Sequence, residues 1–414
     1  MQATLSLKEK IEELREKIPE ARINALDELL HVGLPARKHE EYKYTPLTRF
    51  YEEISGKAGK TEIRPDRYTD PEFILKADTH KLYIINGMFD AETADIPKGI
   101  TVKTNDTPGL KNPKGHDAFD LLNDVLFTSG CNIMVPANFT VEKPLVIINV
   151  IDKASSVSES HISNRIHMGQ NAELTIIEVQ HYIGENESFD SSVSNYHLEK
   201  DARLNSYTVQ VDGNNNYHYN SHHVHQESGS VYNNFTMTLS GKMLRNNHNV
   251  TLDDSHCETN LLGFYFADDQ QHIDNHTTVD HRKPDSNSNE LYKGILKGTG
   301  KGVFNGKIYV RPHAQNTLAY QSNKNILLSD EATVHTKPQL EIWADDVKCS
   351  HGCTAGQLDN EALFYLRSRG LSEDYAKAYL LNAFASEITD EIKPAFLKDY
   401  LSDLIHHKLS SNDR

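Results

Sequence analysis

The most constraining feature of this sequence is a tract of about 260 residues, from Lys81 to Trp343, built from short apolar runs. Apolar and polar side chains alternate within these runs, and Gly, Asn and Asp separate them at intervals of roughly ten residues. Alternation with a period of two predicts β-strands, and helical periodicity is almost absent from the tract. The sequence therefore predicts an all-β core, with a sandwich, a barrel and a parallel β-helix as the alternatives.

Two features favour the parallel β-helix. A tract of about 260 residues exceeds the usual size of a sandwich, whereas a solenoid can simply add coils. Polar Asn, His and Ser also recur on the expected strands, as at residues 217–223, where stacked coils could align them in ladders. No strict repeat length is visible, although a regular solenoid would produce one.

Helical patterns flank the β tract on both sides. Near the N-terminus, Ser6 and Glu9 form a capping box before a stripe of apolar residues at helical spacing: Leu7, Ile11, Leu14 and Ile18. Residues 56–72, which contain Gly and Pro, are expected to form a loop. Helices return after Gly356, with Ser372 as a predicted N-cap. We therefore expect a helical region over 1–75, the β core over 76–345 and a second helical region over 346–414.

The best chemical lead lies at residues 348–353, Lys-Cys-Ser-His-Gly-Cys. If this segment runs extended, Cys349, His351 and Cys353 project from one face of a strand. Thiolates and imidazoles bind zinc, copper and iron–sulfur species. A closed site usually has four ligands and only three are local, so the alternative is a pair of ordinary thiols beside a glycine turn.

Histidine is unusually frequent, with 22 residues. In the cluster His218, His222, His223 and His225, the last two share a strand face and form a feasible metal pair. A solvated or laddered row of histidines is the alternative. A second stretch matches no compact metal motif, and we expect its residues in loops: His256, His272, His276 and His281. Cys131, in an apolar run, is expected to be a buried thiol.

Composition excludes several functions. The net charge of −16 argues against binding nucleic acid or an anionic membrane. No apolar run has the length of a membrane span, and residues 1–10 lack the apolar segment of a signal peptide. Only four cysteines are present, which does not suggest a disulfide framework, so we expect a cytoplasmic protein with reduced thiols.

Known catalytic motifs are also missing from the sequence. The segment 298–307 lacks the spacing of a phosphate loop, so no nucleotide site is expected. Neither a G-x-S-x-G elbow nor an H-E-x-x-H helix occurs. Adjacent acidic pairs such as Asp253–Asp254 point to opposite faces of a strand, which makes each a poor acid/base dyad.

Long ordered blocks of the sequence resemble the SufB/SufD family of iron–sulfur cluster assembly scaffold proteins. They include PARKHEEYKYTPL at 35–47, YIINGMF at 83–89, HDAFDLLN at 116–123, residues 278–310 and 314–352, and FYLRSRGL at 364–371. Chain length and the Lys-Cys-Ser-His-Gly segment look like the SufD side of the family. The resemblance implies a right-handed parallel β-helix flanked by helical regions.

The same resemblance implies a non-catalytic scaffold subunit with two partners, a SufB-like subunit and a SufC-like ATPase. His351 matches the family residue implicated in holding a nascent, transient iron–sulfur cluster shared with SufB, and Cys349 lies in the same motif. Cys353 departs from the family pattern, which usually has a small residue there. The C-terminal helices would dock the ATPase, with these candidate residues: Phe364, Tyr365, Leu366, Tyr379, Leu380 and Phe384.

Two other functional classes stay open from the residues alone. A β-helical carbohydrate-active enzyme is supported by fold class and carboxylate pairs, and a stand-alone metal-binding protein by the cluster at 218–225. The sequence also leaves open whether the isolated chain forms a homodimer.

Overall fold

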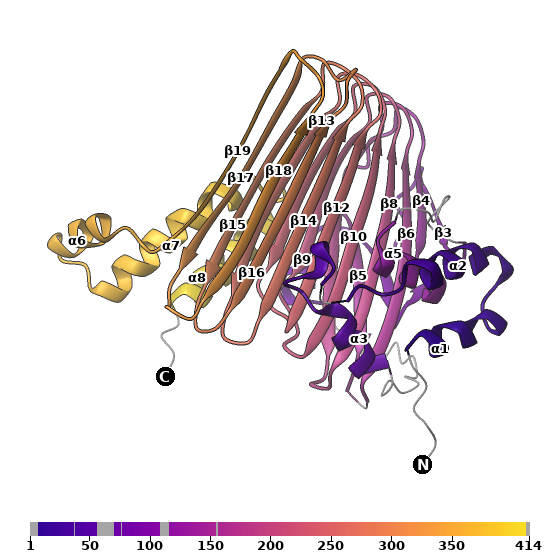
Figure 1. Cartoon of the computed structure of the whole chain (residues 1–414), viewed down its shortest axis with the longest axis horizontal. Coiled ribbons are helices and arrows are strands. Elements are labelled where there is room, and N and C mark those ends of the chain that lie inside the picture. Colours follow the sequence, from indigo (N-terminus) through magenta and orange to yellow (C-terminus); the bar gives the residue numbers. More distant parts are fainter. Residues whose placement is uncertain are drawn as a thin grey trace.

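The computed structural model describes residues 7–36, 38–55, 70–75, 77–107, 116–154 and 156–410. Its centre is a stack of parallel β-coils, and each full coil gives one strand to each of two sheets (Figure 1). The predicted parallel β-helix with flanking helices is therefore confirmed. The expected cap at Ser6 lies outside the described residues, as does most of the loop expected over 56–72.

The described part of the first sheet, sheet A, has the order β19-β17-β15-β13-β11-β9-β7-β5-β1-β2. All neighbours are parallel except β1 and β2. The strand bounds are β1 His80–Ile85, β2 Met88–Asp90, β5 Leu145–Asp152, β7 Glu173–Ile183, β9 Arg203–Gln210, β11 Val231–Thr238, β13 Glu258–Ala267, β15 Asn287–Leu296, β17 Thr317–Leu327 and β19 Val347–Gly356.

Sheet B has the order β18-β16-β14-β12-β10-β8-β6-β4-β3 over the same described ranges, with β3 antiparallel to β4. Its strand bounds are β3 Thr101–Thr104, β4 Cys131–Val135, β6 Ser158–Met168, β8 Ser188–Leu198, β10 Asn216–Gln226, β12 Met243–Leu252, β14 His272–His281, β16 Lys301–Val310 and β18 Thr333–Ile342.

Unequal coils explain why no sequence repeat is visible. Tyr217 pairs with Met243, 26 residues later, whereas Asn132 pairs with Arg165, 33 residues later. The extra residues lie in the turns, where several non-glycine residues adopt a positive φ, such as Asn171 and Asp201. The strands of successive coils stay in register while the turns vary in length. The coil therefore repeats in the structure, although no fixed repeat length appears in the sequence.

The interior between the sheets changes character along the solenoid. Around β4 to β6 it is aliphatic, with Ile133, Ile147 and Ile166 almost fully buried. Further along, buried polar side chains enter the same interior and bond to one another. His222 Nε2 lies 2.9 Å from Glu178 Oε2, and Thr236 Oγ1 lies 3.1 Å from His248 Nε2.

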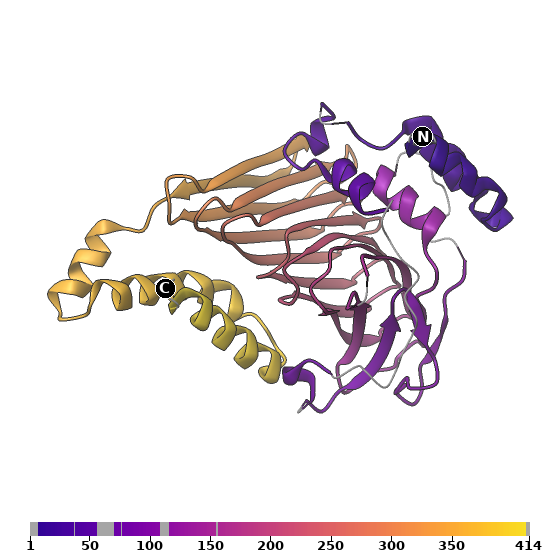
Figure 2. The same ribbon diagram turned by 90° about the horizontal axis from the view of Figure 1, so that it is seen from below.

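The N-terminal elements cover the outer face of sheet B, where apolar side chains of β8, β10 and β12 complete their core. Figure 2 shows these helices on a different side of the solenoid from the C-terminal helices. Their bounds are α1 Leu7–Glu12, η1 Glu13–Glu16, η2 Glu20–Arg22, α2 Ile23–Val32, η3 Glu40–Tyr42, α3 Leu47–Ser55 and α5 Ala118–Leu126. The short helix α4 Glu72–Leu75 lies instead beside sheet A, where Phe73 and Ile74 pack with the C-terminal helices.

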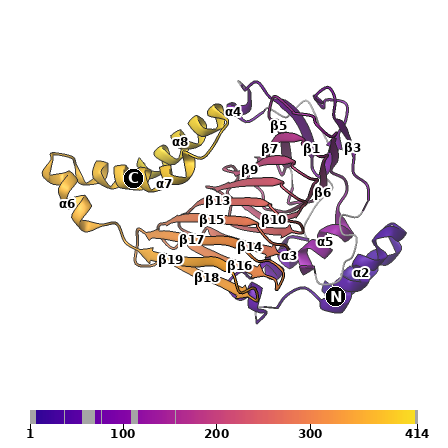
Figure 3. The same cartoon turned by 90° about the horizontal axis from the view of Figure 1, so that it is seen from above.

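The C-terminal helices α6 Asn360–Ser368, α7 Glu373–Thr389 and α8 Ala395–Ser410 form an arm beside sheet A (Figure 3). Leu381 and Ile388 of α7 and Leu401 of α8 pack with apolar residues on the outer face of sheet A, such as Phe264. Ser372 accepts a hydrogen bond from the Tyr375 backbone N–H at 3.3 Å, as its predicted capping role requires.

Several element predictions were wrong. Helix α5 lies inside the tract predicted to be all β; Asp117 begins it by accepting from the Phe119 backbone N–H at 2.8 Å. His272, His276 and His281 belong to strand β14 rather than to loops. Strands such as β8 and β14 carry polar side chains toward a polar interior, so the apolar alternation that marks other strands is absent from them.

Candidate functional site

The segment with the predicted metal donors forms β19, the last strand of sheet A. It runs extended, and its register pairs Cys349 with Ala319 and His351 with Gln321 on β17. Both partners on β17 are buried. The donors therefore continue the inward-facing rows of the solenoid into its final coil, where no further coil covers them in the described part of the chain.

We use the name terminal edge for strands β18 and β19, which end the two sheets. Cys349 is half-buried, whereas His351 and Cys353 are exposed. Partial burial raises the pKa of the Cys349 thiol. Because a thiolate is the metal-binding form, Cys349 has to lose its proton before it can hold iron.

The donors of β19 do not form a closed site by themselves. In the described ranges, three or more His, Cys, Asp or Glu ligand atoms come within 4.8 Å of one another in two places. Neither group contains Cys349, His351 or Cys353. Alternate positions on a strand aim side chains in one direction but keep their tips apart, so additional ligands have to come from outside this strand.

A polar ladder lies behind His351. Glu290 on β15 pairs with Gln321 on β17, which pairs with His351 on β19. The buried Glu290 carboxyl accepts a hydrogen bond from the Thr277 hydroxyl at 2.5 Å. Burial raises its pKa to about 7 against the opposing effects of Thr277 and Gln321. The interior row that ends at His351 thus contains a carboxyl group that can change protonation near neutral pH.

Gly306 makes room for this ladder. A Cβ atom at Gly306 would lie 2.2 Å from the Gln321 amide nitrogen, a distance that real side chains do not tolerate. Glycine on β16 therefore lets the Gln321 amide approach the opposite sheet inside the coil.

The predicted docking residues fall into two groups. Phe364 and Tyr365 on α6 and Tyr379 on α7 are exposed, with 74% of Phe364 and 58% of Tyr379 accessible. Leu366, Leu380 and Phe384 are half-buried. No residue of α6 is fully buried, and the helix presents Phe364 and Tyr365 to solvent while Leu363 and Leu366 are half-buried.

Phe384 contacts the solenoid of its own chain. The Lys293 ammonium group donates to the Phe384 backbone carbonyl at 2.8 Å and lies 4.2 Å from the centre of its ring. Lys293 also pairs with Glu387 on the same helix. These contacts hold α7 against β15 and give Phe384 a positioning role within the chain.

The histidines of β10 alternate between two environments. His218 and His222 point inward and pair with Asp190 and Glu178. His223 and His225 share one face of the strand, as predicted, and this is the outer face. They pair with different carboxylates, His223 with Asp120 and His225 with Asp253. His225 continues a stacked row with His167 and His197, whose ring centres are 5.0 Å apart at each step.

Cys131 is fully buried, and burial raises its thiol pKa, in agreement with its predicted structural role. Sequence reasoning missed the group formed by His116, Asp120 and His223. Asp120 lies about 100 residues before its partner on β10, so no local spacing could indicate it. No helix in the described ranges combines the length and apolar character that crossing a membrane requires.

Comparison with known proteins agrees with this architecture. The model for the SufBD core domain of SUF system FeS cluster assembly matches residues 150–384, and the model for the SufBD protein N-terminal region matches 6–147. The iron-sulfur cluster assembly protein SufD of Escherichia coli K12 is 30% identical over 94% of this chain and 92% of its own length.

Two further relatives also match along most of their length. A SufBD family iron-sulfur cluster assembly protein of Synechocystis is 31% identical, covering 93% of this chain and 89% of its own length. The chloroplastic protein ABCI7 of Arabidopsis thaliana is 27% identical, covering 91% and 83%. The chain thus belongs to the SufB/SufD family of iron–sulfur cluster assembly proteins.

Proposed function

We propose that this chain is the SufD-like, non-catalytic subunit of a cytoplasmic iron–sulfur assembly complex, working with a SufB-like scaffold and a SufC-like ATPase. The nascent cluster is its cargo, held transiently at the boundary with the SufB-like subunit. His351 and Cys349 are the donors from this side, and Cys353 is a secondary one. The ATPase supplies the nucleotide chemistry, and α6 and α7 are its docking elements.

The unpaired terminal edge is the observation that carries this proposal. β19 pairs with β17 on one side, and in the described chain its other side has no strand. An exposed edge of a sheet is a ready template for another chain. Because three inward-row donors lie on that strand without completing a site, a second subunit that adds a coil there would also add the missing ligands.

An incomplete donor set fits a transient cargo. A site closed by four ligands from one chain retains its metal, whereas a site shared across an interface opens when the subunits move apart. An imidazole ligand is lost when it is protonated, which favours release of the cargo. Movement of the C-terminal arm by the ATPase would be one way to drive this opening, since α7 contacts β15 through Lys293.

The first experiment measures cluster formation, by absorbance and iron content, in the complex reconstituted from all three subunits. His351→Ala should reduce the yield at least about tenfold, as expected when a metal ligand is lost. Ser350→Ala is the matched control because Ser350 is also exposed on β19 but faces the other way. Unchanged cluster yield with His351→Ala in an intact complex would refute the donor role.

A second experiment tests docking at α6. Phe364→Ala should weaken binding of the SufC-like ATPase roughly tenfold, because exposed aromatic anchors often dominate such interfaces. Asp399→Ala on α8 changes another exposed side chain of the arm and should have little effect. Equal ATPase affinity for the Phe364→Ala variant and the original protein would remove α6 from the proposed interface.

A further inference from the structure

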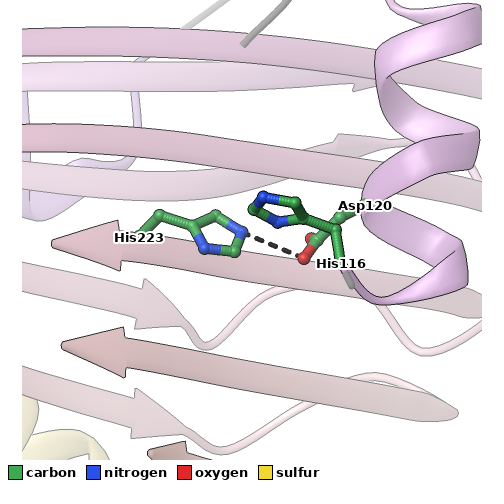
Figure 4. A group of neighbouring side chains, drawn as sticks. All are labelled: His116, Asp120 and His223. Atoms are coloured by element: carbon green, nitrogen blue, oxygen red, sulfur yellow. Dashed lines mark hydrogen bonds and ion pairs between the residues drawn. The ribbon is translucent and has the colours of Figure 1, made fainter. Parts of the chain in front are cut away.

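Three potential metal ligands meet where the N-terminal region contacts sheet B. Asp120 lies in the first turn of α5, His116 just precedes that helix, and His223 lies on the outer face of β10. Their ligand atoms all lie within 4.8 Å of one another. Figure 4 shows the two imidazoles and the carboxylate converging on the space between the helix and the strand.

We propose that His116, Asp120 and His223 bind a divalent transition-metal ion that links α5 to the solenoid. This site is separate from the terminal edge, since β10 and β18, the last strand of sheet B, are separated by β12, β14 and β16. It is a resident ion site and takes no cluster.

The buried carboxylate is already oriented for this role. Asp120 is 1% exposed, and its Oδ1 accepts a hydrogen bond from the Tyr219 hydroxyl at 3.0 Å. Its other oxygen, Oδ2, lies 2.9 Å from His223 Nε2. Hydrogen bonds from outside the ligand set hold metal ligands in place and raise affinity. A metal ion bound at His223 Nε2 would replace the proton that this nitrogen donates to Asp120 Oδ2, and that proton would leave to solvent.

The geometry needs little adjustment. Nitrogen and oxygen ligands lie about 2.1 Å from a zinc-like ion, so neighbouring ligand atoms in a tetrahedral site are about 3.4 Å apart. His116 and His223 meet edge to face, with ring centres 5.3 Å apart. Because both imidazoles are half-buried rather than fully packed, side-chain rotation can bring them onto the ion.

The donor set selects the class of ion. Two imidazoles and one carboxylate without a thiolate suit zinc in an open site or ferrous iron in a facial arrangement. Calcium and magnesium prefer oxygen ligands throughout. The remaining coordination position would hold water, because the two histidines leave one side of the group accessible.

The second ligand group in the described chain is a weaker candidate. His197 and His225 lie on the outer face of sheet B and Glu227 directly follows β10, and all three side chains are more than one-third exposed. The two rings stack at 9°, as a repeating row along the coils does, and Glu227 bonds to His197 at 3.1 Å. No buried carboxylate orients this group, so it serves as the internal control.

The test uses the full chain stripped of metal by a chelator, with Cys349→Ser and Cys353→Ser to remove the two thiols of β19. Co²⁺ is the probe, and binding is followed by visible absorption and equilibrium dialysis. We expect one Co²⁺ per chain, with the spectrum of nitrogen and oxygen ligands, and displacement by Zn²⁺. His116→Ala should weaken binding at least tenfold, whereas His225→Gln should leave it unchanged.

His116→Ala is the informative variant because it leaves the Asp120–His223 ion pair and its hydrogen bonds intact, so folding is preserved. Thermal unfolding gives a second readout: Zn²⁺ should raise the melting temperature of the original chain but not of His116→Ala, because a ligand that binds only the folded state stabilises it. Absence of stoichiometric Co²⁺, binding that survives His116→Ala, or binding lost in His225→Gln would each overturn the proposal.

Discussion

The two ends of the solenoid are built differently. At the N-terminal end, β2 and β3 turn back antiparallel to their neighbours, and every residue of β5 is buried. At the C-terminal end, β18 has no buried residue and β19 is mostly exposed. The interior follows the same trend, from aliphatic side chains near β5 to the polar ladder Glu290–Gln321–His351.

Under the proposed function, this difference separates a well-packed end from an end that takes part in assembly. At the N-terminal end the outermost strands, β2 and β3, have only three and four residues, which leaves little free edge to pair with another chain. In the described chain, the C-terminal end has the longer free edge of β19, which carries the proposed donors Cys349 and His351. The terminal units of a solenoid are usually capped, and under the proposed function the SufB-like subunit supplies the cap at this end.

The largest expected effect is on the free energy of unfolding, through a substitution at the N-terminal end of the solenoid. Ile147→Ala removes a fully buried side chain from β5 and should lower the free energy of unfolding by about 2–5 kcal/mol. Thr354→Ala on β19 changes an exposed side chain and should stay within about 0.5 kcal/mol. Denaturant unfolding of the isolated chain measures both, and equal losses would show that the two ends are equally packed.

The next largest effect is on the pH dependence of stability, through Glu290 in the polar interior. Folding raises the pKa of Glu290 from 4.5 to about 7, so between these values the unfolded chain ionises while the folded chain keeps its proton. Stability therefore falls as pH rises through this window. Relative to Glu290→Gln, the wild-type free energy of unfolding should fall by up to about 3 kcal/mol from pH 4.5 to 8.

Chemical denaturation across this pH range gives the difference directly, because other titrating groups contribute similarly to both proteins. A pH-independent difference between wild type and Glu290→Gln would mean that Glu290 is ionised inside the coil. The interior near the terminal edge would then be better solvated than its burial indicates.

The smallest expected effect on the isolated chain comes from a substitution on β19, at the C-terminal end of the solenoid. A Cβ atom at Gly352 would have no neighbour within 4 Å, so Gly352→Glu should leave the melting temperature unchanged. In the complex the new carboxylate would be buried and unpaired, which should weaken association with the SufB-like subunit by roughly 30-fold. Gly352→Ala is the conservative control, and titration by analytical ultracentrifugation measures the dissociation constant.

Wild-type affinity in Gly352→Glu would show that β19 stays solvent-exposed in the complex. The two ends would then differ in packing but not in their part in assembly.

Sequence reasoning performed best where apolar alternation was strong. Leu145–Val150 and Leu174–Val179 were predicted as strands and lie within β5 and β7. The pattern failed at β8 and β14, where the side chains facing the interior are polar and bond to each other across coils. The family and the fold class could be predicted from the chain alone, because the matching blocks are long and ordered.

The positions of the proposed donors also show which features local spacing predicts and which it does not. Local spacing predicted that Cys349, His351 and Cys353 share a strand face, because a strand alternates its side chains with a fixed period. Their place on the last, uncovered strand depends on how many coils precede them, which no local pattern encodes. Asp120 and His223 meet only because α5 packs on β10, across about 100 residues of chain.

The sequence by itself thus determined the β-helix, its helical flanks and the residue types that could hold iron, since these depend on short-range periodicity and on recognisable blocks. Only the tertiary structure decided which end of the solenoid stays open and which distant side chains converge, because contacts between coils depend on register and on turns of unequal length.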